Sequence, residues 1–334
     1  MNEMLAVRLH AKGDLRVETI DPPQPPAAGE VTLAVSAAGI CGSDLHNYRT
    51  GAWISRAPSV AGHEFTGTVT AMGHGVSHVR IGDRVVVDSR CICGICPACR
   101  NGRGQVCEKL GFLGEVIDGG FAEEVTLPGR NVMKAADGVP DRHLAMAEPL
   151  AVALHALRRL ASPASSRVVI TGCGPIGGLV ALLATREGHS VSVVDRNDRR
   201  AALVARAVGG RVATLASLAQ EGFRFAIDTT GHDQVIAALI QTVGSCGTLA
   251  LVGIGRLGPV IDPVMLVERE ITLVGCHAFG PELVEVNAML PDLSPHLDPF
   301  IAEQIPLEAV PDAYARHLAG QVDGLKTIIL SRED

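Results

Sequence analysis

Aromatic residues are scarce in this chain of 334 residues, where one Trp, two Tyr and seven Phe make up 3% of the sequence. An excess of positive charge is also missing, because 29 Lys and Arg face 36 Asp and Glu, which gives a net charge of −7. Nucleic-acid surfaces need basic residues for phosphates and aromatic rings for base stacking. The composition therefore disfavours nucleic acid and anionic membranes as partners and favours a small-molecule substrate.

Long apolar runs are absent as well. No segment approaches the roughly 18 consecutive apolar residues that indicate a membrane-spanning helix. Residues 1–23 carry charges in every short window and lack the apolar core of a signal peptide. These absences predict a cytoplasmic protein, in a compartment that keeps thiols reduced. Clustered cysteines are then expected to bind a metal rather than to form disulfides.

Two regions with different patterns of apolar and polar residues follow each other along the chain. Up to about residue 150, short alternating segments separated by Gly and Pro predict an antiparallel, barrel-like domain with strands at 31–39, 67–72, 84–89 and 121–127. After a helix predicted at 148–160, apolar strands alternate with helices at 175–187, 198–208 and 232–243. The strands, expected at 167–172, 190–195, 225–231, 247–253 and 271–276, indicate a parallel sheet covered on both faces. Residues 281–334 return to mixed elements.

A glycine-rich turn connects the first of these strands to a helix. Gly172, Gly174 and Gly177 form a GxGxxG pattern, in which the glycines allow a tight turn, contact with a pyrophosphate and close packing of helix on strand. The second strand ends at Asp195, at the offset expected for an acid that binds the adenosine ribose. Such an acid repels a 2′-phosphate, so NAD is expected and NADP less so. The predicted cofactor-binding residues are Gly172, Gly174, Pro175, Ile176, Gly177, Asp195 and Arg196.

Five of the nine cysteines lie within residues 91–107. Cys93, Cys96, Cys99 and Cys107 are separated by two, two and seven residues, which is a spacing that metals use. A ferredoxin-type cluster would need three residues and then Cys-Pro at the end of the run, and this ending is missing.

Other residues of ligand type precede the sheet region. Cys41, His63, Glu64 and Glu148 offer a thiolate, an imidazole and carboxylates, a set that suits zinc. Each has a simpler structural interpretation when it is taken alone, as a buried cysteine, a loop histidine or a surface acid.

Taken together and in order, these segments resemble the zinc-containing medium-chain alcohol/polyol dehydrogenases over nearly the whole chain. The matching motifs are GICGSDLH (39–46), GHEFTGTV (62–69), GDRV (82–85), the cysteine run, GGFAEE (119–124), AEPLAVALHA (147–156) and the glycine turn. Sorbitol, L-idonate, 2,3-butanediol and threonine dehydrogenases are the nearest branches.

The resemblance implies a fold and two zinc ions. It predicts an α/β protein in which residues 1–150 and 281–334 form a GroES-like, mostly antiparallel β-barrel catalytic domain. Residues 151–280 would form a Rossmann domain with a doubly wound parallel sheet. A structural zinc would bind Cys93, Cys96, Cys99 and Cys107, with Cys91 outside the set. A catalytic zinc would bind Cys41 and His63, completed by Glu64 and Glu148 directly or through water.

The resemblance also implies a reaction. Zinc lowers the pKa of the substrate hydroxyl, and hydride then leaves the same carbon for NAD. Ser43 and His46 would relay the proton, and Asp44 would orient the metal ligands; Ser43 and Asp44 also suit a helix cap. Family members are homodimers or homotetramers, and the apolar strand at 247–253 is a candidate for an edge-to-edge contact.

Two departures bear on the substrate. His277 and Ala278 stand where sorbitol and L-idonate dehydrogenases have a Phe-Arg pair that holds substrate oxygens, and Asn47 replaces an aromatic residue. The expected substrate is a secondary alcohol, either a polyol, a sugar alcohol or a sugar acid, with a butanediol- or threonine-type reaction as an alternative. A non-catalytic NAD-binding redox sensor or structural protein and a zinc-free enone reductase are further alternatives.

Overall fold

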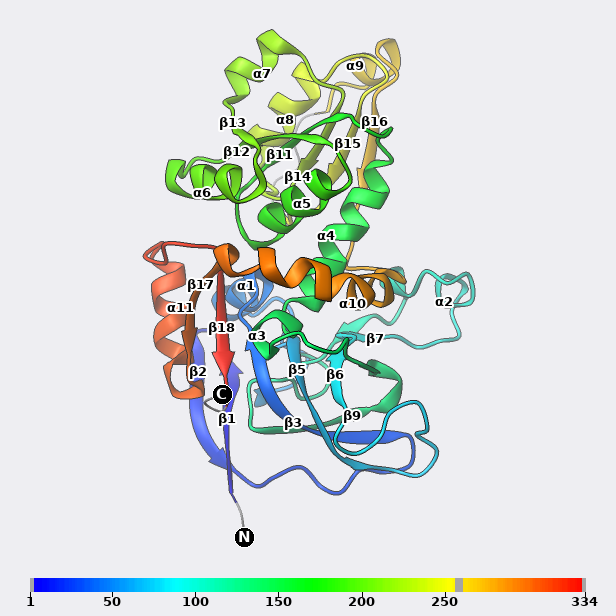
Figure 1. Cartoon of the computed structure of the whole chain (residues 1–334), viewed down its shortest axis with the longest axis vertical. Helices are drawn as coiled ribbons and strands as arrows, with labels where there is room; N and C mark the ends of the chain where they lie inside the picture. The colour runs from blue at the N-terminus through cyan, green and yellow to red at the C-terminus, as the bar shows by residue number, and fades with distance from the viewer. Residues whose placement is uncertain (1–2, 256–260, 332–334) are drawn as a thin grey trace. The chain divides into compact units, whose positions relative to one another are not determined.

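The structure is a computed structural model that describes residues 3–255 and 261–331, and the chain divides into two compact units (Figure 1). Unit 1 contains the residues up to Glu148, Leu283–Val322 and the residues from Lys326 onward. Unit 2 contains Pro149–Glu282 and Asp323–Leu325. Unit 2 is thus inserted into unit 1, and the first unit is built from segments far apart in the sequence.

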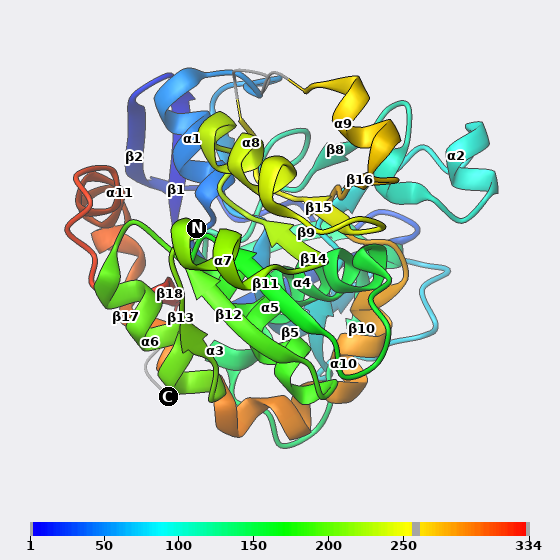
Figure 2. The same ribbon diagram turned by 90° about the horizontal axis from the view of Figure 1, so that it is seen from above.

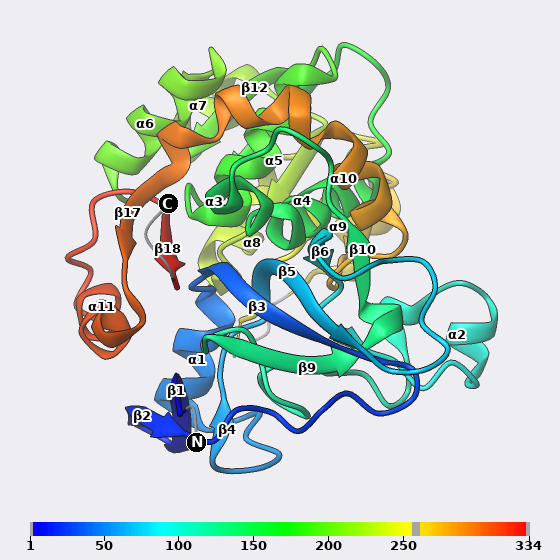
Figure 3. The ribbon, with the colours of Figure 1, turned by 60° about the horizontal axis from the view of Figure 1, so that its bottom comes forward.

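Unit 1 is organised around a sheet of seven strands. The strand order is β10-β6-β5-β3-β18-β17, and β9 also pairs with β3 (Figure 3). All of these pairings are antiparallel except that of β17 with β18. The strands are β3 (Glu30–Gly39), β5 (Glu64–Met72), β6 (Arg84–Val87), β9 (Glu124–Pro128), β10 (Val132–Lys134), β17 (Ile301–Ile305) and β18 (Lys326–Leu330).

Smaller elements surround this sheet. A second sheet contains β1 (Met4–Ala11), β2 (Asp14–Ile20) and β4 (Ser59–Val60), and β7 (Arg90–Cys91) pairs with β8 (Gly111–Phe112). The helices are α1 (Gly42–Thr50), α2 (Pro97–Arg100), α3 (Asp141–Leu144), α10 (Glu282–Leu293) and α11 (Val310–Leu318). One apolar core includes Val7 of β1, Leu33 of β3, Phe65 of β5 and Tyr314 of α11, together with Phe121 from the segment before β9. Burying such side chains contributes about 1.5–3 kcal/mol each.

Unit 2 contains a parallel sheet with the order β13-β12-β11-β14-β15-β16. Its strands are β11 (Arg167–Thr171), β12 (Ser190–Val194), β13 (Arg211–Val212), β14 (Phe225–Asp228), β15 (Thr248–Leu251) and β16 (Thr272–Gly275). Helix α4 (Ala147–Leu160) leads into this unit, and the others are α5 (Pro175–Arg186), α6 (Asp198–Val208), α7 (Leu215–Glu221), α8 (Asp233–Thr242) and α9 (Pro263–Glu268). Figure 2 shows α5 and α8 on opposite faces of the sheet. The predicted fold class, a mostly antiparallel domain with a doubly wound parallel-sheet domain, is confirmed.

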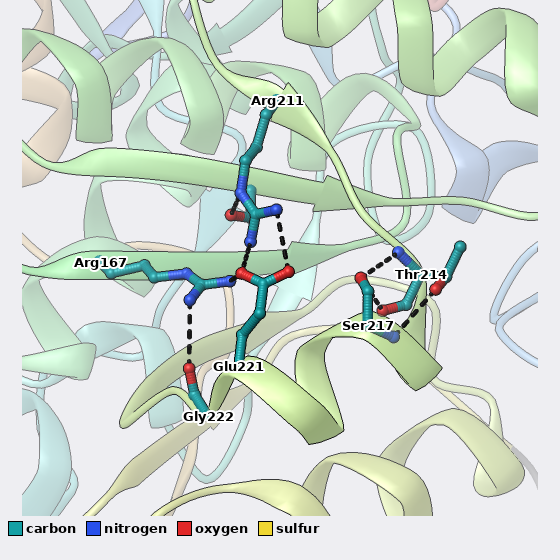
Figure 4. A network of polar contacts seen from close by, with 7 residues as sticks. Arg167, Arg211, Thr214, Ser217, Glu221 and Gly222 are labelled. Carbon is teal, nitrogen blue, oxygen red and sulfur yellow. Dashed lines mark hydrogen bonds and ion pairs between the residues drawn. The ribbon is translucent and has the colours of Figure 1, made fainter.

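A polar network ties α7 to the sheet of unit 2 (Figure 4). Arg167 on β11 and Arg211 on β13 both pair with the carboxylate of Glu221 at the end of α7. The Arg167 guanidinium also donates to the carbonyl of Gly222. All three charged side chains are between 29% and 45% exposed, and such pairs contribute about 0–1 kcal/mol each.

One local expectation is wrong. The apolar segment predicted as a candidate edge strand, 247–253, contains β15, which lies between β14 and β16. Its backbone groups are already paired on both sides, and the edges of the described sheet are β13 and β16. An apolar strand buried on both faces is typical of the interior of a parallel sheet, so its composition indicates a central position.

Candidate metal and dinucleotide sites

The first metal-ligand residue lies where β3 ends and α1 begins. Cys41 is the residue before the first turn of α1, and the carboxylate of Asp44 accepts a hydrogen bond from its backbone N–H at 2.8 Å. An acid at this position satisfies a free N–H of the helix start and favours the helix dipole. The predicted capping role of Asp44 is therefore present, and it fixes the backbone of Cys41.

His63 and Glu64 lie at the start of β5, and both are buried. The second carboxylate oxygen of Asp44, Oδ1, is 3.1 Å from Nδ1 of His63, so the same carboxylate contacts both Cys41 and His63. Burial opposes protonation of His63, but Asp44 and Cys41 outweigh it and raise the pKa of His63 well above its ordinary value. With Nδ1 directed at Asp44, Nε2 is the atom that remains for a metal.

The donor atoms of Cys41, His63 and Glu64 form a tight cluster. One ligand atom of each lies within 4.8 Å of the others. Oxygen Oε1 of Glu64 is buried without a hydrogen-bond partner, while Oε2 forms an ion pair with Lys326 of β18. A buried carboxylate oxygen without a donor carries a desolvation penalty, which a cation at this point would remove. The residues present therefore fit zinc.

Glu148 lies outside this three-residue cluster. Its carboxylate is buried and accepts a hydrogen bond from the Ser89 hydroxyl at 2.8 Å. Burial, together with the neighbouring charge of Glu64, raises the pKa of Glu148 to about 7. Its proximity to Glu64 and His63 is consistent with the predicted alternative of contact through water.

The predicted relay residues lie on α1. The Ser43 hydroxyl is 3.4 Å from Nε2 of His63, and the ring of His46 packs in a tilted arrangement against Trp53, with centroids 4.8 Å apart and planes 35° from parallel. Asn47 is buried, and its side-chain oxygen accepts a hydrogen bond from the Trp53 backbone N–H at 2.9 Å. This contact gives Asn47 a structural role, since its amide oxygen orders the segment after α1.

The four cysteines of the second cluster converge around α2. One Sγ atom of each of Cys93, Cys96, Cys99 and Cys107 lies within 4.8 Å of the others. The Cys93 and Cys107 sulfurs are 3.5 Å apart, and those of Cys96 and Cys107 are 3.9 Å apart. A tetrahedron with Zn–S bonds of about 2.3 Å has sulfurs about 3.8 Å apart. The cluster thus has the dimensions of a tetrathiolate zinc site.

Backbone N–H groups support thiolates in this cluster. The Cys93 and Lys109 amides both lie 3.3 Å from the Cys107 sulfur. The Cys99 amide lowers the pKa of Cys96 to about 6. Cys91 lies outside the cluster, and burial raises the pKa of its thiol to about 11. All nine cysteines fall within the described ranges, and none forms a disulfide.

The predicted dinucleotide turn begins directly after β11. Gly172 has a φ of +91°, which non-glycine residues rarely adopt. A Cβ at Gly177 would collide with the Gly172 carbonyl oxygen, whereas a Cβ at Gly174 would meet nothing within 4 Å. Protein packing therefore explains two of the glycines. The open space at Gly174, before the N-terminus of α5, suits the backbone approach of a pyrophosphate.

Asp195 lies beside this turn, at the end of β12. Its two oxygens accept hydrogen bonds from the backbone N–H groups of Cys173 at 2.6 Å and Asn197 at 2.7 Å. A carboxylate keeps further lone pairs for a ribose hydroxyl. Pro175 and Ile176 form the first turn of α5, and Arg196 is exposed. His277, which also follows a strand end of this unit, is exposed.

Comparison with known proteins identifies relatives of the whole chain. Residues 27–139 match the family Alcohol dehydrogenase GroES-like domain, and residues 175–292 match the family Zinc-binding dehydrogenase. The 2-dehydro-3-deoxy-L-galactonate 5-dehydrogenase of Pseudoalteromonas atlantica is 32% identical over 91% of this chain and 92% of its own. This chain belongs to the zinc-containing medium-chain alcohol/polyol dehydrogenase family.

Solved structures of other proteins share the fold of this dehydrogenase. The 2R,3R-butanediol dehydrogenase from Bacillus subtilis has a TM-score of 0.91 and 28% identity, and the match covers 98% of this chain and 100% of that one. A short chain alcohol dehydrogenase from Escherichia coli CFT073, complexed with NADH, has a TM-score of 0.91 and 27% identity, covering 99% and 100%. The predicted zinc-dependent oxidoreduction of a secondary alcohol is confirmed at family level, and the non-catalytic alternative is not favoured.

Two contacts at the candidate sites of this dehydrogenase were not predicted from the sequence. Lys326 forms an ion pair with Glu64, and Ser89 forms a hydrogen bond with Glu148. A lysine that begins the apolar segment KTIIL was a signal, because a charge in a buried strand requires a partner. No comparable pattern surrounds Ser89.

Proposed function

We propose that this dehydrogenase transfers hydride from a secondary alcohol of a polyol or sugar acid to NAD, with zinc at Cys41, His63 and Glu64. The observation that supports this function is the buried thiolate, imidazole and carboxylate cluster, whose donor atoms lie within 4.8 Å of one another. A bound zinc supplies Lewis acidity that lowers the pKa of an alcohol, and NAD accepts the hydride. We propose that Cys93, Cys96, Cys99 and Cys107 hold a second, structural zinc.

The chain's own residues would manage the proton. With NAD bound, the C–H bond of the carbinol would break with its electron pair going to the cofactor while a C=O bond forms, and Ser43 and His46 would carry the hydroxyl proton to solvent. Ser43 lies 3.4 Å from Nε2 of His63, at the metal-facing side of the imidazole. Asp44 keeps the proton of His63 on Nδ1. Glu148, with its pKa near 7, would hold a water beside the metal or an additional ligand position.

The substrate class rests on relatives and on one missing group. The relatives named above oxidise a sugar acid derivative and butanediol, according to their names. The arginine that anchors substrate oxygens in sorbitol and L-idonate dehydrogenases is replaced here by Ala278, next to the exposed His277. Without a guanidinium, a carboxylate loses a bidentate partner. We therefore place vicinal diols and polyols ahead of aldonates.

Asp195 supports NAD rather than NADP as the cofactor. Its carboxylate lies beside the glycine turn, where a 2′-phosphate would meet a like charge. We also propose a cytoplasmic homodimer or homotetramer that pairs through β16, which is one of the two edge strands of the described parallel sheet. Among the described helices, none combines the length and the apolar character that crossing a bilayer requires.

The test is a panel of polyols, aldonates, butanediol and threonine, with NADH formation followed by absorbance. Cys41→Ser should abolish turnover and remove one of two zinc ions, while calorimetry still detects NAD binding. Cys91→Ser is the matched control, because Cys91 lies outside both clusters, and it should keep both ions and full activity. Full activity of the Cys41→Ser variant would exclude the proposed site.

A further inference from the structure

Three adjacent strands of unit 1 place an ion pair at the proposed catalytic metal site. Glu64 on β5 is paired with Gly39 on β3, and β18 runs along the other side of β3, with Ile328 opposite Gly39. Lys326, the first residue of β18, reaches back over β3 to the Glu64 carboxylate. Its ammonium also donates to the carbonyl oxygen of Ile40 at 3.0 Å. Both side chains are almost completely buried, at 2% and 1% exposure.

The absence of a side chain at Gly39 makes room for this pair. A Cβ there would overlap Oε2 of Glu64 and would approach Cε of Lys326 to 2.8 Å. Gly39 has no need for an unusual backbone angle, since it is not among the glycines with positive φ. Its small size therefore serves the Glu64–Lys326 contact, and the next two residues, Ile40 and Cys41, connect that contact directly to the thiol ligand.

We propose that Lys326 is a positioning residue that holds Glu64 by Oε2, so that the carboxylate offers the metal one oxygen and is neutralised when the metal is absent. This inference rests on the proposed function, since it concerns the zinc site formed by Cys41, His63 and Glu64. Oε1 is the oxygen that remains buried without a partner on the described residues. Lys326 thus competes with the metal for the charge of Glu64.

A thermodynamic cycle gives the direction of the effect. Removing the lysine charge leaves Glu64 as an uncompensated buried carboxylate in the zinc-free protein, which is strongly destabilising. In the loaded protein the metal itself compensates Glu64, so the same substitution is less harmful there. A change that destabilises the free state more than the bound state must tighten binding by the difference. A lysine with a merely structural role would destabilise both states equally and would leave zinc affinity unchanged.

The test uses Lys326→Met, which keeps the length of the side chain and removes its charge. The assay follows the release of zinc from the loaded enzyme into an excess of chromogenic chelator. The kinetic phase of release that is present in the wild type and missing in Cys41→Ser is assigned to the catalytic site. We expect this phase to slow at least tenfold in Lys326→Met and the melting-temperature gap between loaded and zinc-free protein to widen. Lys326→Arg, which keeps the charge, should release zinc at the wild-type rate.

Thr327→Val is the matched control on the same strand. Thr327 is equally buried, but its hydroxyl bonds Glu303 and His317 instead of a metal ligand. This variant should lower both melting temperatures together and leave zinc release unchanged. Wild-type release in Lys326→Met, with an unchanged melting gap, would overturn the inference while leaving the zinc site in place. Failure of Cys41→Ser to remove a release phase would instead reject the proposed function itself. If the Lys326→Met protein is too unstable to study without zinc, the rate of zinc release can still be measured, because that assay starts from the zinc-loaded enzyme.

Discussion

Asp44→Asn isolates what one carboxylate does at the proposed catalytic site. Asp44 accepts a hydrogen bond from the Cys41 backbone N–H at 2.8 Å and contacts Nδ1 of His63 at 3.1 Å. An asparagine has nearly the same shape but only one acceptor oxygen. The backbone N–H of Cys41 is always a donor, so the amide oxygen should face Cys41 and the NH₂ group should face His63. The imidazole must then carry its proton on Nε2, the atom needed for the metal.

The expected magnitude follows from this mismatch. Loss of the hydrogen-bond partner of a ligating histidine lowers metal affinity by about 10–100-fold, or roughly 1.4–2.8 kcal/mol. The hydrogen bond from the Cys41 N–H should survive in Asp44→Asn, because the amide oxygen can still accept it, whereas Asp44→Ala loses it at a cost of about 1 kcal/mol. The two variants should thus share a zinc defect but differ in the melting temperature of the zinc-free protein.

Competition with a chromogenic chelator measures the affinity, and calorimetry measures stability. A zinc affinity of Asp44→Asn within about twofold of wild type, well below the tenfold minimum, would refute the reasoning. Such a result would mean that His63 is held by its surroundings rather than by the carboxylate. Equal melting temperatures for zinc-free Asp44→Asn and Asp44→Ala would refute only the claim that the side chain at position 44 stabilises the start of α1.

Three further predictions concern other parts of the chain. Cys99→Ser should reduce the zinc content from two ions to one, measured by elemental analysis, and lower the melting temperature, because a closed tetrathiolate site stabilises its loop. Asp195→Ala should weaken NAD binding about tenfold or more in calorimetry, as expected for losing a hydrogen bond to a charged group. The same variant should reduce the ratio of the affinity for NAD to the affinity for NADP. Burial lowers the pKa of His143 below its ordinary value of about 6.5, so its contribution to stability is present above that pH and is lost as the pH falls through the lowered pKa. His143→Gln should flatten the fall of the melting temperature on the acid side of about pH 6.5.

Local patterns in the sequence predict one part of the candidate sites well. The glycine turn, Asp195 and the four cysteines each depend on spacing within a short segment, and their geometry follows from a single loop or strand-turn-helix unit. The helix at 148–160 and the strand at 190–195 also lie within one or two residues of α4 and β12. In these places the residues that determine the structure are neighbours in the chain.

The remaining contacts depend on pairing between distant segments. Lys326 meets Ile40 across 286 residues, and Ser89 meets Glu148 across 59. The spacing of residues within one segment does not predict which distant strand will pair with it, because the packing of the whole sheet determines that pairing. The edge strand was misassigned for the same reason. An apolar strand shows that it is buried, but the neighbours that bury it come from elsewhere in the chain.

The order of strands in unit 1 has a consequence for synthesis of the chain on the ribosome. Strand β3 is completed early, but the partner that covers its far end, β18, emerges only after all of unit 2 has been translated. At about 5–20 residues per second, the interval is on the order of 15–60 s. During that time the backbone groups of residues 37–39, which later bond β18, are an unprotected sheet edge next to Cys41. The nascent protein therefore exposes an aggregation-prone edge beside the thiol of Cys41, and we expect chaperone binding at this stage to cover both.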